Sequence, residues 1–451
     1  MVKMKNLREF TKEELGAFIA ENRKRYEAIK AQGLAIDMSR GKPSPVQLDM
    51  AFEDFKKAFE ITDYYSKTGF DCRNYGLLDG VAEAKELFAE LLGVETKNII
   101  IGGNASLELM FSFISQCWSH GIGGCKPWSE QEDVKFIAVV PGYDRHFGIA
   151  EYFGIKMVNV PISATGPDMD KVEELVKDPS VKGMFCVPKY SNPDGFTYSE
   201  ETVERLAKMK PAAPDFRVIW DNAYIIHEIY EEGDELANIF DYAKKYGTED
   251  NFVEFCSTSK ITFPGAGISA LAASDANIKE ILKRLTIQII SYDKMNQLRH
   301  AKMYPTVDDL KAVMKKHAAI MRPKFDAVLD MLEKELGGLG IASWHKPGGG
   351  YFVSLNVDTG SAKYAGQLCK DAGLTLTGVG ATFPYKNDPE DKNIRIAPSY
   401  PSVEELEKAA ELLCVAVKLA AAEALLAFVK TCKGRTNKDN AKLASQIRNL
   451  I

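Results

Sequence analysis

The sequence predicts an α/β protein in which a large domain, built on a mostly parallel central sheet, is followed by a smaller α+β domain. Short continuous apolar segments alternate with amphipathic helical segments from about residue 81 onward, which is typical of parallel strands buried on both faces. After about residue 306 a long helical run begins and the order of elements changes. At 451 residues the chain is also longer than one hydrophobic core usually supports.

The elements follow from hydrophobic periodicity, taken in chain order. A helix is predicted over residues 11–32, with Thr11 as its cap and Gly33 as its stop, and a stretch rich in Gly and Pro follows at residues 39–45. Buried strands, each short and apolar, are predicted over residues 98–101, 135–140, 156–160, 183–187, 217–220 and 251–256. Helices are predicted between some of them, over residues 81–92, 107–118, 168–176 and 199–208.

The last part of the chain predicts the smaller domain. Its elements are a helix over residues 307–336, a strand over 351–355, a helix over 362–372, a strand over 393–397 and a helix over 403–429. The predicted division is an N-terminal helix and covering segment, residues 1–48, a large domain, residues 49–306, and a small domain, residues 307–451. We expect the N-terminal segment to pack with the small domain.

Composition excludes several classes of protein. The formal net charge is −6, whereas nucleic-acid-binding surfaces are basic, so no nucleic-acid partner is expected. The six histidines have no HxxxH or HxH spacing, so no metal site is expected. The longest apolar stretch, residues 412–429, is interrupted by Lys418 and Glu423, which favours a packing helix and no membrane span.

Cysteine usage and the N-terminus predict the location of the protein in the cell. The eight cysteines form no CxxC pair and several lie in apolar runs, which indicates reduced and mostly buried thiols. Residues 1–21 are charged and lack the apolar core of a signal peptide. Together these observations predict a cytoplasmic protein.

Polar residues gather where the predicted strands end, which is where parallel sheets place their functional groups. The turn Gly102-Gly103-Asn104-Ala105-Ser106 opens a helix whose N–H groups can bind phosphate, with an ordinary helix cap as the alternative. Tyr143, after the strand at 135–140, can stack on an aromatic ring or simply pack at a loop edge. Residues 192–195, Asn-Pro-Asp-Gly, are a strong turn signal that needs no functional role.

Two further strand ends carry charged groups. Asp221 abuts the apolar strand at 217–220 and needs a cationic or N–H partner, which a structural ion pair could supply. Lys260 follows the strand at 251–256, within Ser257-Thr258-Ser259-Lys260, and either reaches solvent or is buried for a task. Burial lowers the pKa of a lysine and makes its amine nucleophilic toward carbonyls.

Together these groups describe one ligand, pyridoxal 5'-phosphate (PLP). Its aldehyde suits Lys260, its phosphate suits the helix N-terminus with nearby serines, and its ring suits stacking on Tyr143. Asp221 would keep the ring nitrogen protonated, and Asn192 and Tyr224 would bind the phenolic oxygen.

The same motifs, in this order and spacing, resemble those of the fold-type I PLP-dependent aminotransferases of class I and II. The matching positions, within residues 39–429, are Tyr75, residues 103–106, Pro141-Gly142-Tyr143, Asn192-Pro193-x-Gly195, Asp221-x-x-Tyr224, Ser257-x-Ser259-Lys260 and Arg395. Residues 39–43 and 393–398 further resemble the bacterial type Ic aspartate aminotransferase subgroup. The resemblance implies the PLP-dependent transferase fold of type I, with PLP in the large domain.

The resemblance also implies a role for each site residue. Lys260 would hold PLP as a Schiff base and then move protons, with Asp221 and Tyr224 as the other catalytic groups. The implied cofactor-binding set is Lys260, Asn104, Ala105, Ser106, Tyr143, Asn192, Asp221, Tyr224, Ser257, Ser259 and Tyr75. Gly41, Asn192 and Arg395 would bind substrate, and Arg395 would clamp its α-carboxylate. Tyr75 would reach the neighbouring subunit's site, which implies a homodimer.

One position departs from the family pattern. Members of the family usually carry a phosphate-binding arginine eight residues after the lysine, where this chain has Ile268. Arg299 and Lys189 are the candidates to replace that arginine.

The implied reaction moves an amino group from an L-amino acid to a 2-oxo acid by a ping-pong mechanism through Lys260, with aspartate and 2-oxoglutarate as the preferred pair. Candidates for binding the distal carboxylate are Arg40, Lys42, Arg145 and Arg299. One alternative is a preference for aromatic, alanine or 2-aminoadipate donors, and another is a PLP-dependent lyase of the aminocyclopropane-carboxylate synthase or cystathionine-lyase kind. The effector-binding half of an aminotransferase-like transcription regulator is disfavoured, because the 38 residues before Ser39 are too few and too acidic for a winged helix.

Overall fold

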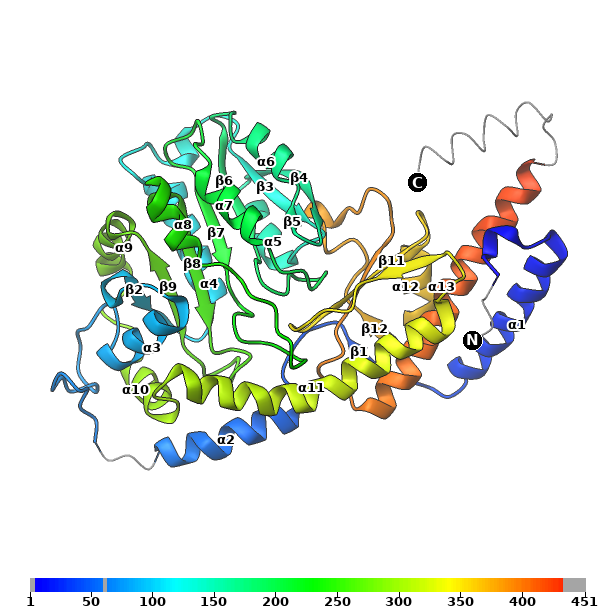
Figure 1. Ribbon diagram of the computed structural model, residues 1–451, viewed down its shortest axis with the longest axis horizontal. Helices are drawn as coiled ribbons and strands as arrows, with labels where there is room; N and C mark the ends of the chain where they lie inside the picture. The colour runs from blue at the N-terminus through cyan, green and yellow to red at the C-terminus, as the bar shows by residue number, and fades with distance from the viewer. Residues whose placement is uncertain (1–4, 60–62, 433–451) are drawn as a thin grey trace.

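A computed structural model describes residues 5–59 and 63–432 of the chain, and its larger part is built on an eight-stranded sheet (Figure 1). The strand order is β2-β9-β8-β7-β6-β3-β4-β5. The bounds are β2 Ile99–Ile101, β3 Lys135–Val140, β4 Lys156–Ser163, β5 Gly166–Pro167, β6 Val181–Cys186, β7 Arg217–Asp221, β8 Phe252–Ser257 and β9 Ser269–Ala273. Five adjacent strands, from β8 to β4, are parallel, so the predicted mostly parallel sheet is confirmed.

The sequence did not predict strand β9, which pairs antiparallel with both β2 and β8. Its residues, Ser-Ala-Leu-Ala-Ala, are small and lack the β-branched side chains that mark a strand. They are nevertheless fully buried, because β9 lies inside the sheet between two neighbours. Tertiary pairing therefore overrides local propensity here.

Helices cover both faces of this sheet, as predicted for strands that are apolar throughout. One face carries α3 Ala82–Leu92, α6 Met169–Leu175, α7 Glu200–Lys208, α8 Ile239–Tyr246 and α10 Lys294–Met303. The other carries α4 Ser106–His120, α5 Asp144–Tyr152 and α9 Asp275–Gln288. Alternate residues of β8 serve the two faces, with Phe252 and Cys256 in one core and Val253 and Phe255 in the other.

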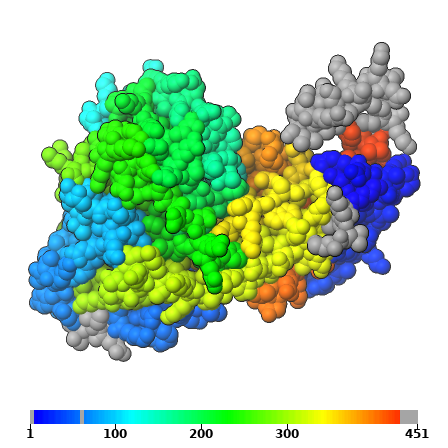
Figure 2. All heavy atoms as spheres, in the orientation of Figure 1, coloured from blue at the N-terminus to red at the C-terminus, as the bar shows by residue number. Residues whose placement is uncertain are grey.

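The smaller part of the molecule contains an antiparallel sheet of β10 Ala342–Trp344, β11 Val353–Val357 and β13 Asn393–Ile396. Its helices are α12 Ala362–Asp371 and α13 Val403–Cys432, and a second small sheet pairs β1 Ile36–Met38 with β12 Leu374–Leu376 in parallel. The N-terminal helix α1 Lys12–Lys30 lies along α13 (Figure 1). Figure 2 shows this N-terminal segment, in blue, at the end of the molecule formed by the small part. Thr11 caps α1 in a capping box with Glu14, as predicted, and the helix ends three residues before Gly33.

The long helix α11 Val307–Leu336 joins the two parts of the molecule (Figure 1). Its first turns, including Leu310 and Met314, pack in the core of the large part, whereas Phe325 and Leu332 pack in the core of the small part. Helix α2 Pro45–Phe59 lies below α10 in the same view. The proposed division at residues 48 and 306 stays a prediction.

Helix α13 carries the longest apolar stretch of the sequence. Within residues 5–59 and 63–432 it is the one helix long and apolar enough to cross a membrane, a test that core helices of soluble proteins also pass. Leu412, Leu413 and Val415 are buried against neighbouring elements that include α1, α11 and α12.

Candidate active site

A cavity of about 640 Å³ opens at the carboxyl ends of the parallel strands, between the large and small parts of the molecule. The predicted site residues come together there, because parallel strands all end at one edge of the sheet. Those that line it are Gly41, Ala105, Ser106, Tyr143, Asn192, Asp221, Tyr224, Ser257, Ser259, Lys260 and Arg395. Two predicted residues, Asn104 and Tyr75, do not line it.

Lys260 lies three residues beyond the end of β8, and its side chain faces the cavity. The amine lies 4.9 Å from the centre of the Tyr224 ring. Burial lowers the pKa of Lys260, and the negative charge of Asp221 opposes that shift. A lysine amine with a lowered pKa is nucleophilic, which is the property that a carbonyl cofactor requires.

Asp221 is the last residue of β7 and is buried. Its Oδ2 lies 3.0 Å from Nε2 of His146, whereas its Oδ1 has no hydrogen-bond partner among the described residues. A buried carboxylate oxygen is costly without a donor, and the protonated ring nitrogen of PLP would supply one. The residues present therefore fit this cofactor.

The sequence interpretation missed His146. It lies on α5, buried against Phe185, whose ring is stacked on it at 4.9 Å and 10°. The one local signal was its place three residues after Tyr143, which brings the two side chains to the same side of a helix start. Their rings meet edge to face at 5.0 Å.

Two tyrosines border the cavity near Lys260. Burial raises the pKa of Tyr143 to about 12 and raises the pKa of Tyr224 well above its ordinary value. Both phenols are therefore protonated at neutral pH and can donate a hydrogen bond.

The turn before α4 has the features of a phosphate site. Ala105 is the N-cap of α4 and makes no side-chain cap bond, so the first N–H groups of the helix keep their capacity to bind an anion. Ser257 donates to Ser259 at 3.1 Å, and Ser259 donates to the carbonyl of Asn104 at 3.1 Å. The side chain of Asn104 itself donates to the carbonyl of Pro264, so Asn104 shapes the turn.

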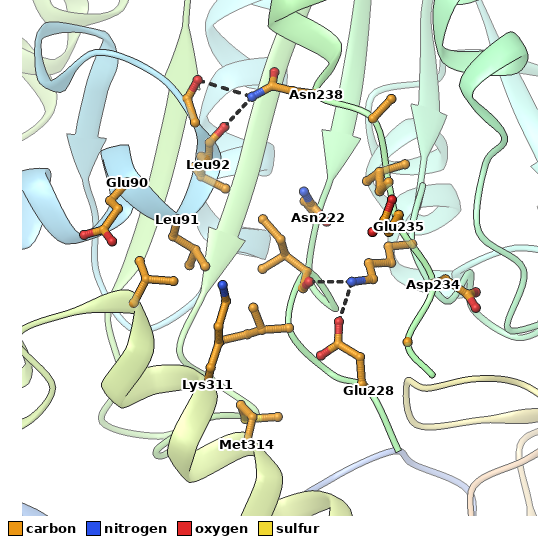
Figure 3. A pocket seen from close by; sticks show the side chains of 18 of the residues that line it. Glu90, Leu91, Leu92, Asn222, Glu228, Asp234, Glu235, Asn238, Lys311 and Met314 are labelled. Atoms are coloured by element: carbon orange, nitrogen blue, oxygen red, sulfur yellow. Dashed lines mark hydrogen bonds and ion pairs between the residues drawn. The ribbon is translucent and has the colours of Figure 1, made fainter. Parts of the chain in front are cut away.

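Neither candidate for the missing phosphate-binding arginine lines this cavity. Ile268 is buried, and its N–H donates to Oγ1 of Thr258 at 3.0 Å. Lys189 lines a separate cavity of about 1070 Å³, in which its amine is paired with Glu228 at 2.5 Å. Figure 3 shows Glu228 in this cavity. Arg299 contributes to neither of these two cavities.

Arg395, on β13, has its guanidinium fixed on several sides. Nη1 donates to Asn192 at 3.1 Å and to Asp144 at 2.9 Å, and Nε donates to Thr377 at 3.2 Å. The guanidinium carbon lies 4.9 Å from the centre of the Phe352 ring. A buried, oriented guanidinium of this kind is suited to a planar carboxylate.

Further cations line the same cavity. Arg40, Lys42 and Arg145, all candidates from the sequence, are among them, and Arg299 is not. Lys386, which the sequence did not single out, is a fourth and has a left-handed backbone with φ of 55°. Gly41 lies so close to Phe352 that a Cβ would come within 2.6 Å of its ring. Residues 39–44, called the covering segment below, therefore pack directly on the small part.

Three groups meet at the carboxyl ends of these parallel strands: a lysine amine, an unpaired carboxylate oxygen and a helix N-terminus that can bind phosphate. Together with this order of helices and strands, they define the class of fold-type I PLP-dependent enzymes. Comparison with known proteins narrows that class. The family model described as aspartate amino-transferase matches residues 10–428. The chain belongs to the aspartate aminotransferase family, and it is a PLP-dependent aminotransferase.

Individual relatives agree with this assignment. The chain is 45% identical to the aspartate aminotransferase of Corynebacterium glutamicum over 421 residues. This alignment covers 93% of this chain and 97% of that protein. The crystal structure of an aspartate transaminase from the same species matches with a TM-score of 0.91 at 45% identity, covering 93% of this chain and 99% of that chain. LysN, an α-aminoadipate aminotransferase from Thermus thermophilus, matches at 19% identity with a TM-score of 0.69, over 90% of this chain and 98% of that chain, and shares the fold.

Proposed function

We propose that the protein transfers the amino group of L-aspartate to 2-oxoglutarate, with PLP held by Lys260. The observation that carries this proposal is the set of cations around Arg395. Arg40, Lys42, Arg145 and Lys386 line the same cavity as the predicted carboxylate clamp. Both substrates of the pair are dicarboxylates, and a positively charged cavity favours them over amino acids with neutral side chains.

Each residue of the site has one task in this reaction. PLP, when bound, supplies the electron sink of the transamination. The amine of Lys260 takes the proton from the α-carbon of the substrate. Oδ1 of Asp221, which has no partner among the described residues, would hold the protonated ring nitrogen of PLP, and the neutral phenol of Tyr224 would donate to its phenolic oxygen.

The substrate is oriented by groups of the small part and the covering segment. Arg395 binds the α-carboxylate, and Asn192 keeps the guanidinium in place through its 3.1 Å contact. Arg40, Gly41 and Lys42 line the cavity and would help to exclude water once substrate is bound. The serines and the α4 N-terminus hold the phosphate.

The distal carboxylate has three exposed cations to choose from, Arg40, Arg145 and Lys386. The fourth, Lys42, is engaged with the ring of Tyr400 at 3.9 Å. We favour Arg145, because it follows Tyr143 and Asp144 on the same turn that holds Arg395. A guanidinium there can pair with a carboxylate in two-pronged fashion.

Initial rates over a panel of amino donors test this proposal. Aspartate should have the highest kcat/KM, and Arg145→Ala should raise its KM by about tenfold, the loss of one charge-assisted hydrogen bond. The KM for alanine should stay unchanged, because alanine has no distal carboxylate. Lys370→Ala, which removes an exposed lysine of α12 outside the cavity, is the matched control. A clearly higher kcat/KM for aromatic or branched donors than for aspartate would contradict the aspartate assignment.

We also propose that the protein is a homodimer in which Tyr75 reaches the neighbouring site. Tyr75 is 75% exposed, so its ring is free to contact a second subunit. Other exposed apolar side chains lie on α2 and at the end of α9, with Phe52 at 51% and Ile287 at 89% exposure. Exposed apolar side chains such as these are the ones that a subunit interface would bury.

Hybrid dimers test the shared site. Co-expressed Lys260→Ala and Tyr75→Ala chains should form mixed dimers in which one site has both an intact lysine and an intact tyrosine. Activity should then recover to about one quarter of the wild-type value, because half of the dimers carry one complete site. A monomer in sedimentation analysis, or no recovery in the mixture, contradicts the proposal.

A cytoplasmic location belongs to the same proposal. The seven cysteines whose side chains are described are free thiols, and six of them are buried. This supports a reducing compartment, where such thiols persist.

A further inference from the structure

A buried polar cluster lies behind Lys260 and does not line the active-site cavity. Its members are Gln47 of α2, His227 in the loop after β7, His317 of α11 and Tyr351 before β11, and none is more than 3% exposed. Buried polar groups are costly unless each has a structural partner or a task. The transamination chemistry described above uses none of the four.

Hydrogen bonds connect this cluster to Lys260 at one end. The phenol of Tyr351 donates to the main-chain carbonyl of Lys260 at 3.4 Å and accepts from Nε2 of Gln47 at 3.3 Å. Both distances are long for such bonds, so the phenol has room to tighten. Hydrogen bonds around active sites are often long before substrate binds and shorten afterwards.

The other end of the cluster reaches the segment that covers the cavity. Oε1 of Gln47 accepts from both the N–H of Ser44, at 3.0 Å, and its hydroxyl, at 3.2 Å. Nε2 of Gln47 also lies 2.7 Å from Nδ1 of His317, which anchors the amide on α11. Gly41 belongs to the same segment, and a Cβ added there would lie 3.0 Å from Cβ of Tyr351.

The ring of Tyr351 also supports a catalytic side chain. It lies 6.2 Å from the ring of Tyr224, at an angle of 24°, on which the amine of Lys260 rests. His227 packs edge-on against both tyrosine rings. Burial and the neighbouring charge of Lys260 lower the pKa of His227 well below its ordinary value, so the imidazole is neutral.

We propose that Tyr351 is a positioning residue that fixes the main chain of Lys260 and, through Gln47, ties it to the covering segment. These contacts restrict the positions that the main chain of Lys260 can take, and in this way they orient its amine for proton transfer. The inference rests on the proposed function, because it requires Lys260 to move the substrate proton. Tyr351 and Gln47 do not line the cavity themselves and would act on it through Lys260.

Tyr351→Phe tests the proposal, because it removes the hydroxyl and keeps the ring. The kcat with aspartate should fall about fivefold, the value of one ordinary hydrogen bond, while KM stays within about twofold. The pH midpoint of the visible absorbance of the holoenzyme should also rise, by about 0.5 unit, because a looser Lys260 is better solvated.

Two further variants complete the experiment. Tyr198→Phe removes the hydroxyl of another fully buried tyrosine, outside the cavity, and should leave kcat and the pH midpoint unchanged. Gln47→Leu, which also removes the contacts with Ser44 and His317, should lose at least as much kcat as Tyr351→Phe. The double variant should lose no more than Gln47→Leu alone, because both residues act along one path. Thermal unfolding of the cofactor-free forms measures any general loss of stability separately.

Three results overturn the inference: an unchanged kcat and pH midpoint in Tyr351→Phe, an equal shift in Tyr198→Phe, or additive losses in the double variant. A wild-type protein that binds no PLP or transfers no amino group has a different meaning. That outcome rejects the proposed function itself, so the two failures are distinguishable.

Discussion

Replacing Lys260 by alanine is expected to lower turnover with aspartate by about 10⁴-fold or more and to remove the visible absorbance of covalently held PLP. The amine is the one group in the cavity with both a lowered pKa and a place beside Asp221 and Tyr224. Stopped assays with aspartate and 2-oxoglutarate, together with absorbance spectra of the reconstituted protein, measure both losses.

Lys189→Ala is the matched control for that variant. Lys189 is also a buried lysine, but it lines the other cavity and pairs with Glu228 there. Figure 3 shows Glu228 in that cavity. It should keep the colour and most of the activity. The far-ultraviolet circular dichroism of Lys260→Ala should match the wild type, because its side chain faces the cavity. An active, yellow Lys260→Ala protein would refute the assignment.

The second large effect is expected for Asp221→Asn. The amide keeps the size of the carboxylate and its contact with His146, but it loses the charge that holds a protonated ring nitrogen. The rate should fall by about 10³-fold, as for other losses of preorganised electrostatic stabilisation. PLP occupancy at saturating cofactor should stay near that of the wild type, since the phosphate and Lys260 contacts are untouched.

His146→Asn separates the carboxylate from its neighbour. This variant leaves Asp221 in place and removes one contact at 3.0 Å, so its loss of rate should be much smaller. Equal losses in both variants, or a loss of PLP binding in Asp221→Asn that matches the loss of rate, would contradict the role assigned to the charge.

Most of the catalytic cavity was predictable from the sequence because its residues follow strands of one parallel sheet. Asp221 ends β7 and Lys260 follows β8, and the pairing of these strands puts the two side chains side by side. Asn192 and Tyr143 follow β6 and β3 in the same manner. A motif placed at a strand end thus carries three-dimensional information without any knowledge of the loops.

Other parts of the site depend on contacts that no local pattern reveals. His146 and Asp221 are 75 residues apart, and Gln47 lies 270 and 304 residues from His317 and Tyr351. These pairs form only once helices from different parts of the chain have packed. Lys386 depends on a left-handed backbone that its residue type does not favour.

Most strands of the fold were predictable from local sequence patterns, whereas strand β9 was missed because its position depends on pairing with distant strands. Strand β3 is a continuous apolar run after Lys135, and strand β8 is mostly apolar apart from the buried Glu254, so their composition and length mark them as strands. Strand β9 is made of small residues, and its place between β2 and β8 is fixed by pairing rather than by propensity. The irregular stretch at residues 39–45 was recognised from its Gly and Pro content, and its covering role was implied by the family resemblance. Its contacts with Tyr351 and Phe352 became visible only in the structure.

The central claim, amino-group transfer through Lys260, is tested most directly by mixing the holoenzyme with L-aspartate in the absence of any 2-oxo acid. We expect one change of the visible absorbance, one equivalent of the oxo acid of aspartate per active site, and recovery of the original spectrum when 2-oxoglutarate is added. Continued release of ammonia or of oxo acid without an acceptor would instead identify a lyase and contradict amino-group transfer through Lys260.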